Sequence, residues 1–239
     1  MLKTERMDRV RAALRAQGLT QMIVCDPKSV WYLTGVAVEP YERLLALYLP
    51  TEGEPVLFLN RLFNVPEPPC RTVWHTDTDR PVAQIAEVVD AGRPLGIDKE
   101  WPAKFLIPLM ETHPGMQVVL SSDCVDDCRA CKDAEEQALM REASRINDTV
   151  NEAAKHYIKA GMTEREVAEF IDAQFRAHGC EGPSFTTIVS FGANAADPHH
   201  EPDDTVLKEG DCVLFDMGCV KSRYCSDMTR TWFCGQPTE

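Results

Sequence analysis

The stretch FDMGCVKSRYCSDMTRTWF, residues 215–233, places two aspartates in a segment that otherwise has the pattern of a tight β-hairpin. Its second half alternates with period two. Successive side chains of a strand point to opposite faces, so Asp227 and Thr229 share one face. Asp216 lies on the preceding strand-like segment. If the two segments pair across the loop 219–223, both aspartates project to the same side of neighbouring strands.

Two carboxylates held close together repel, and one takes up a proton unless a cation lies between them. A divalent metal ion removes this conflict, and oxygen ligands suit hard or borderline ions such as Mn²⁺ or Co²⁺. The sequence therefore predicts Asp216 and Asp227 as a candidate pair of metal ligands. The alternative, which spacing alone favours, is an exposed acidic hairpin whose aspartates face water or pair with Arg223 and Arg230.

A second group of candidate residues lies in SFGANAADPHHEPDD, residues 190–204. Glycine, asparagine and proline mark this stretch as a loop between strands, and it carries His199 and His200. Adjacent side chains point in different directions, so at most one of the two histidines joins a given site. The alternative is a solvated acidic loop with two surface histidines.

Three cysteines, Cys124, Cys128 and Cys131, lie close together near the middle of the chain. The CxxC spacing of the last two suits half a zinc site or a redox pair. No second CxxC follows, so the pattern favours free thiols at a helix entry. The cysteines of the strand-rich region are expected to be small core residues.

Charge and composition narrow the class of protein. The 239 residues carry 25 Lys and Arg against 38 Asp and Glu, a net charge of −13, which disfavours nucleic acid and anionic membranes as main partners. No stretch approaches the ~18 apolar residues of a membrane span. The N-terminal stretch MLKTERMDRVRAALRAQG is amphipathic and has no apolar signal region. We therefore expect a cytoplasmic protein with reduced cysteines.

Helix and strand patterns predict a domain at 1–125, a joint at 126–132 and a second domain at 133–239. In the first domain, strands are expected at 21–26, 44–50, 55–60, 94–98 and 117–122, helices at 4–17, 81–91 and 101–112, and a turn-rich segment at 26–35. Alternating strands and helices predict an α/β domain.

The second domain begins with a run of helix formers at 133–160, ended by Gly161. Thr163, followed three residues later by Glu166, is a capping box that opens a second helix reaching about His178. The strand-like segments that follow are 184–192, 211–218 and 224–233. Two helices followed by three strands predict one α+β unit.

Four motifs of the second domain occur in the order found in the pita-bread metallopeptidases, which include Xaa-Pro dipeptidases (prolidases), aminopeptidase P and methionine aminopeptidase. They are AGMTEREVA (160–168), SFTTIVSFGANAADPHH (184–200), LKEGDCVLFDMG (207–218) and YCSDMTRTWF (224–233). The first domain is similar to the creatinase-type N-terminal domain of prolidases and aminopeptidase P, which methionine aminopeptidase lacks. It carries DPKSVWYLTG (26–35) and PLGID (94–98). The resemblance implies an α/β creatinase-like N-terminal domain followed by the first half of an α+β pita-bread domain.

The resemblance also implies roles for individual residues. Asp216 matches the family's first metal-ligand aspartate, and Asp227 matches the second, which bridges two metal ions. His199 matches the histidine that lies beside the substrate and helps to stabilise the tetrahedral intermediate, whereas His200 matches no catalytic position. The implied activity is metal-assisted hydrolysis of small peptides whose second residue is proline. The implied cofactors are two divalent ions, Mn²⁺ first and Co²⁺ or Zn²⁺ as alternatives. Relatives with this N-terminal domain are often dimers, so we expect a homodimer.

The sequence departs from the family pattern downstream of Asp227. The family site has five protein ligands, namely these two aspartates, then a histidine and two glutamates. After Asp227 the sequence holds no histidine and a single glutamate, Glu239. Two carboxylates are too few to hold a dinuclear centre tightly, so we expect the 239-residue chain by itself to have little or no peptidase activity. A creatinase-like amidinohydrolase and a non-catalytic peptide-binding protein of the same fold stay as alternatives, and the two retained aspartates weigh against both.

Overall fold

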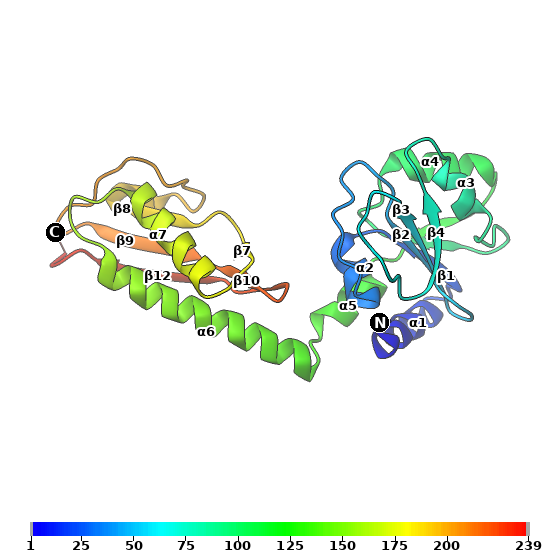
Figure 1. The fold of residues 1–239 in the computed structure, drawn as a ribbon, viewed down its shortest axis with the longest axis horizontal. Coiled ribbons are helices and arrows are strands. Elements are labelled where there is room, and N and C mark those ends of the chain that lie inside the picture. The colour runs from blue at the N-terminus through cyan, green and yellow to red at the C-terminus, as the bar shows by residue number, and fades with distance from the viewer. Residues whose placement is uncertain (1, 238–239) are drawn as a thin grey trace. The chain divides into compact units, whose positions relative to one another are not determined.

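The computed structural model describes residues 2–237, which form two compact units that divide between Cys131 and Lys132. Figure 1 colours the first unit from blue to green and the second from green to red. No helix of the described residues is long and apolar enough to cross a membrane.

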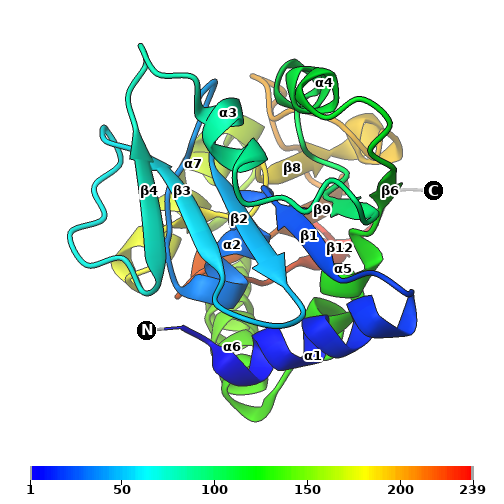
Figure 2. The ribbon, with the colours of Figure 1, turned by 90° about the vertical axis from the view of Figure 1, so that its right-hand side faces the viewer.

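The first unit is built on a six-stranded sheet in the order β4-β3-β2-β1-β5-β6, and Figure 2 shows β4, β3, β2 and β1 side by side. The pairs β1–β5, β5–β6 and β3–β4 are parallel, and β2 runs antiparallel to both of its neighbours. The strands are β1 (Gln21–Val24), β2 (Ala46–Pro50), β3 (Val56–Asn60), β4 (Arg71–His75), β5 (Leu95–Ile97) and β6 (Val118–Leu120). The helices are α1 (Thr4–Ala16), α2 (Pro27–Thr34), α3 (Pro81–Ala86), α4 (Ala103–Thr112) and α5 (Asp123–Ala130).

Helices cover both faces of this sheet, which confirms the predicted α/β class. Neighbouring residues of β3 pack on opposite sides: Leu57 joins the cluster with α1, α2 and α5, and Phe58 joins the cluster with α3 and α4. Both side chains are fully buried, as expected for a central strand with helices on each face. Helix α5 covers residues 126–130 of the segment expected as the joint, and its Cys124 packs in the first cluster.

The prediction of a turn-rich segment at 26–35 is wrong, because helix α2 occupies it. The Asp26 carboxylate accepts hydrogen bonds from the backbone N–H groups of Lys28 and Ser29, and Pro27 lies in the first turn. Gly35 ends the helix in the left-handed conformation at φ 75°. Asp26, Pro27, Ser29 and Gly35 are residue types that also favour turns, which explains the wrong prediction. Strand β4 was not predicted.

The second unit begins with the two predicted helices, α6 (Ala134–Tyr157) and α7 (Glu164–Ala177). The capping box predicted at Thr163 and Glu166 is confirmed, and α6 begins with a second one formed by Asp133 and Glu136. A capping box satisfies two backbone donors at a helix start, so both helices begin where local sequence directs.

Two three-stranded sheets complete the second unit, in the orders β12-β9-β8 and β11-β10-β7. The elements are β7 (Gly182–Pro183), β8 (Ile188–Phe191), the 3₁₀ helix η1 (Gly192–Ala196), β9 (Cys212–Met217), β10 (Cys219–Lys221), β11 (Tyr224–Cys225) and β12 (Met228–Phe233). The predicted pairing of the two aspartate-bearing segments is confirmed, since β9 and β12 are antiparallel neighbours. The connecting loop is shorter than 219–223, because 219–221 and 224–225 pair as a small hairpin whose turn is Ser222 and Arg223.

Candidate functional site

The register between β9 and β12 places Asp216 and Thr229 on one face of the sheet. Asp216 lies directly opposite Thr229, and Asp227 comes two residues before Thr229 along the chain. Opposite residues of an antiparallel pair share a face, and so do residues two apart in an extended strand. Asp227 lies just before β12, so its place on the same side as Asp216 stays a prediction.

The helices of the second unit pack against the other face of this sheet. Val213, Phe215 and Met217 alternate with Asp216 along β9, are fully buried, and form one cluster with side chains of α6 and α7. Thr229 and Asp227 are exposed. Asp216 therefore lies on the face of the sheet that the helices leave open, and Asp227 is exposed just before β12.

Asp216 has a carboxylate oxygen that the described residues leave unsatisfied. Its Oδ1 is buried and accepts no hydrogen bond from residues 2–237. A buried carboxylate oxygen without a partner is costly, so native structures supply one from protein, water or an ion. Oxygen donors on neighbouring strands are a set that a divalent cation such as Mn²⁺ accepts. The residues present thus fit part of a metal site.

At the junction of β9 and β10, Gly218 and Cys219 lie next to Ser226, the residue before Asp227. Ser184 Oγ donates to the Ser226 carbonyl oxygen at 2.7 Å, and the Cys219 N–H donates to Ser226 Oγ at 3.0 Å. A Cβ added at Gly218 would overlap the Ser226 carbonyl oxygen and Ser184 Oγ. Asn147 of α6 is fully buried, and its Nδ2 donates to the Met217 carbonyl oxygen at 2.9 Å. These contacts fix the backbone immediately before Asp227.

His199 lies in the loop that follows β8 and is exposed. Its backbone N–H donates to Asp197 Oδ1 at 2.9 Å. This loop leaves β8 at Phe191, whereas Asp216 lies opposite Ile188 at the other end of that strand. Among residues 2–237, no hydrogen bond or ion pair joins His199 to Asp216 or Asp227. The structure thus pairs the strand of Asp216 with the strand that follows Asp227, and the roles of the two aspartates and of His199 stay predictions.

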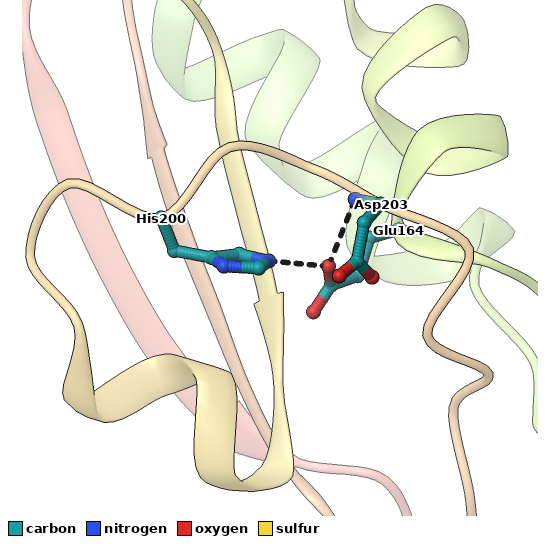
Figure 3. Close-up of side chains that lie close together, drawn as sticks. All are labelled: Glu164, His200 and Asp203. Carbon is teal, nitrogen blue, oxygen red and sulfur yellow. Dashed lines mark hydrogen bonds and ion pairs between the residues drawn. The ribbon is translucent and has the colours of Figure 1, made fainter.

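A cluster that the sequence did not predict joins Glu164, His200 and Asp203, and Figure 3 shows the three side chains together. One ligand-type atom of each lies within 4.8 Å of the others. Glu164 is fully buried, His200 half-buried and Asp203 exposed. A hydrogen bond from the Thr205 side chain lowers the pKa of the Asp203 carboxyl. No local pattern indicates this cluster, because an acidic residue in the first turn of a helix is ordinarily solvated and complements the helix dipole.

The three cysteines near the middle of the chain lie on or beside α5 and are free thiols. Burial raises the pKa of the Cys124 thiol to about 11, and burial also raises the pKa of the Cys128 thiol. Raised pKa values suppress the thiolate, which is the form that binds zinc and exchanges disulfides. The burial of Cys124 and Cys128 thus favours inert thiols over a redox or zinc site.

Alkylation of the native protein at pH 8 is expected to modify Cys124 at least about ten times more slowly than the exposed Cys131 and Cys225, because few Cys124 thiols ionise. Mass spectrometry of peptides after timed iodoacetamide treatment measures the rates, and urea-unfolded protein serves as the control in which the sites react alike. Equal rates in the native protein would show that burial does not suppress ionisation of the Cys124 thiol.

Comparison with known proteins assigns the family. Residues 6–131 match the sequence profile of the creatinase/prolidase N-terminal domain, and residues 138–239 match that of metallopeptidase family M24. The chain belongs to the M24 metallopeptidases. It consists of a creatinase-type N-terminal domain followed by part of the M24 pita-bread domain. The resemblance predicted from the motifs is therefore confirmed.

Relatives of this M24 chain are peptidases by description. An uncharacterized peptidase of Staphylococcus epidermidis is 30% identical over 96% of this chain and 66% of its own length. One from Staphylococcus aureus is 34% identical over 90% of this chain and 62% of its own length. A crystal structure of a prolidase from Thermococcus sibiricus superposes with a TM-score of 0.90 at 29% identity, covering all of this chain and 67% of that one. A dipeptidase of Mycobacterium ulcerans gives a TM-score of 0.89 at 30% identity. The chain thus spans about two thirds of the length of the relatives it matches.

Proposed function

We propose that the full-length protein, meaning the gene product as its own cell makes it, is a dinuclear metallopeptidase that hydrolyses small peptides with proline in second position. Asp216 and Asp227 are its first two metal ligands. The observation that carries the proposal is the buried, unsatisfied Asp216 Oδ1, on a strand paired with the strand that follows Asp227. Similarity to a prolidase of Thermococcus sibiricus supports the same substrate class.

Two divalent ions, Mn²⁺ first and Co²⁺ or Zn²⁺ as alternatives, supply Lewis-acid polarisation of the scissile carbonyl and a nucleophilic water when bound. The chain's own part is to hold carboxylate oxygens in fixed positions on β9 and before β12. His199 is assigned to the substrate side, where its imidazole donates a hydrogen bond to the oxygen that gains charge in the transition state. The proline nitrogen carries no N–H, so a site shaped around the pyrrolidine ring replaces the hydrogen bond that ordinary peptide bonds offer.

The substrate panel that tests the proposal contains Ala-Pro, Ala-Ala, Ala-Pro-Ala and creatine, each incubated with Mn²⁺-loaded full-length protein. We expect cleavage of Ala-Pro to exceed that of Ala-Ala, and Ala-Pro-Ala separates a dipeptidase from an aminopeptidase. Hydrolysis of creatine alone would assign the protein to the amidinohydrolases, and binding of peptide without cleavage would make it a non-catalytic member of the fold.

The 239-residue chain by itself is expected to hydrolyse Ala-Pro no faster than its Asp216→Ala variant. Two carboxylates cannot hold two ions tightly, because tight divalent sites use more protein ligands. Proline release measured for the two purified chains at equal concentration gives the comparison. A rate for the unmodified chain well above that of the variant would show that residues 1–239 suffice.

The full-length protein is also proposed to act as a cytoplasmic homodimer, with peptide as its only partner. A net charge of −13 on these residues supports the exclusion of nucleic acid and anionic membranes. Light scattering at two protein concentrations tests the dimer, and a monomer mass at both would reject it.

A further inference from the structure

Glu164, the first residue of α7, is an acidic residue with a fully buried side chain. Carboxylates are almost never fully buried unless they are paired. The helix does not require this burial, because Thr163 and Glu166 already cap it through their own reciprocal hydrogen bonds. The buried carboxylate therefore serves something other than the helix start.

Four donors surround the Glu164 carboxylate, and all four belong to the segment 191–203. Oε1 accepts from the Phe191 backbone N–H at 2.7 Å and from Asn194 Nδ2 at 3.0 Å. Oε2 accepts from His200 Nε2 at 2.6 Å and from the Asp203 backbone N–H at 3.1 Å. Two of these contacts are the dashed lines of Figure 3. One side chain thus holds the loop at its start, its middle and its end.

Further contacts around Glu164 close the network. Asn194 Nδ2 also donates to Thr205 Oγ1 at 3.1 Å. The Glu164 backbone N–H donates to the Thr205 carbonyl oxygen at 3.2 Å. The loop from Gly192 to Thr205 is therefore tied at both ends to the first turn of α7.

The same cluster could be read as a metal site, since Glu164, His200 and Asp203 offer ligand atoms within 4.8 Å of one another. An ionised carboxylate has about four lone-pair positions, and N–H donors already use four on Glu164. An ion would have to displace these donors and release the loop. The geometry therefore favours a structural anchor over a metal centre.

We propose that Glu164 is a positioning residue of the M24 site, whose carboxylate holds the loop 192–205 in the conformation that presents His199. His199 is the neighbour of His200 in sequence, so the hydrogen bond that fixes the His200 ring also fixes the backbone next to His199. The inference rests on the proposed function for the role of His199, and on the structure alone for the anchoring of the loop.

The test compares Glu164→Gln with the matched control Glu166→Gln in the full-length protein. The control removes the same charge two residues away, from an exposed side chain that can still accept the capping hydrogen bonds. Hydrogen–deuterium exchange of peptides covering 191–205 reports the loop without requiring activity. Steady-state kinetics on Ala-Pro and the bound-metal content report the site.

For Glu164→Gln we expect at least tenfold faster exchange across 191–205, a kcat at least tenfold lower, little change in KM and unchanged metal content. His200→Ala, which removes one donor and leaves Glu164 in place, is expected to shift exchange and kcat in the same direction by less. If Glu164→Gln does not fold, His200→Ala provides the test in its place. The Glu166→Gln control is expected to match the wild type.

Unchanged exchange in Glu164→Gln would overturn the anchoring, and faster exchange with an unchanged kcat would overturn the positioning of His199. Loss of a bound ion together with activity would overturn the structural assignment in favour of a metal site. Absence of Xaa-Pro hydrolysis in the wild-type protein counts against the proposed function, and the exchange comparison still decides whether Glu164 anchors the loop.

Discussion

Replacing Asp227 with asparagine is expected to lower Ala-Pro hydrolysis by the full-length protein at least about a thousandfold. Metal catalysis supplies several kcal/mol of transition-state stabilisation, and each 1.36 kcal/mol is worth about tenfold in rate. An amide is neutral and would be a weaker ligand for a divalent cation than a carboxylate. Bound metal, measured by elemental analysis after desalting, should fall together with kcat.

Asp148→Asn is the matched control for this loss, because it removes the same charge from an exposed aspartate of the same unit. Asp148 lies 3.7 Å from Arg230, a surface ion pair that contributes ~1 kcal/mol at most. The control should keep its metal and its activity. An Asp227→Asn protein with full metal content and a wild-type kcat would refute the assignment of Asp227 as a ligand.

Gly218→Ala is expected to destabilise the second unit by about 3 kcal/mol or more. The added methyl group would overlap the Ser226 carbonyl oxygen and the Ser184 hydroxyl that hydrogen-bonds to it. Backbone atoms cannot move aside as a flexible side chain does, so the two strands must separate. Hydrogen exchange of the β9 amides in denaturant follows the unfolding of this unit.

Gly92→Ala provides the comparison for the glycine substitution. Its added Cβ would come within 3.2 Å of Asp90 Oδ1, an atom of an exposed side chain that can rotate away. The expected cost is less than about 1 kcal/mol for the first unit. If Gly218→Ala destabilised the second unit no more than Gly92→Ala destabilises the first, the backbone at Gly218 and Ser226 would be less closely packed than the structure shows.

Local signals explain the elements that the sequence predicted correctly. The capping box of Thr163 and Glu166 fixes the start of α7 within a few residues, so no distant contact is needed to place it. Period-two alternation likewise predicted the strand that follows Asp227, and this strand pairs with β9 as expected. Both features are encoded within about ten residues of chain.

Features that depend on distant residues could not be predicted in this way. Helix α2 at Pro27–Thr34 was missed because its capping residues are the same ones that make turns, and packing against the sheet decides between the two. The burial of Glu164 depends on donors that lie 27 to 39 residues further along the chain. The unsatisfied oxygen of Asp216 is visible only once three strands are in place.

The most direct measurement is the rate of Ala-Pro hydrolysis by full-length protein before chelation, after chelation and after return of Mn²⁺, beside an Asp216→Asn variant. The proposed site predicts that chelation abolishes proline release and that Mn²⁺ restores it in the wild-type protein but not in the variant. Undiminished hydrolysis by protein shown to be free of metal would contradict a metal centre at Asp216 and Asp227.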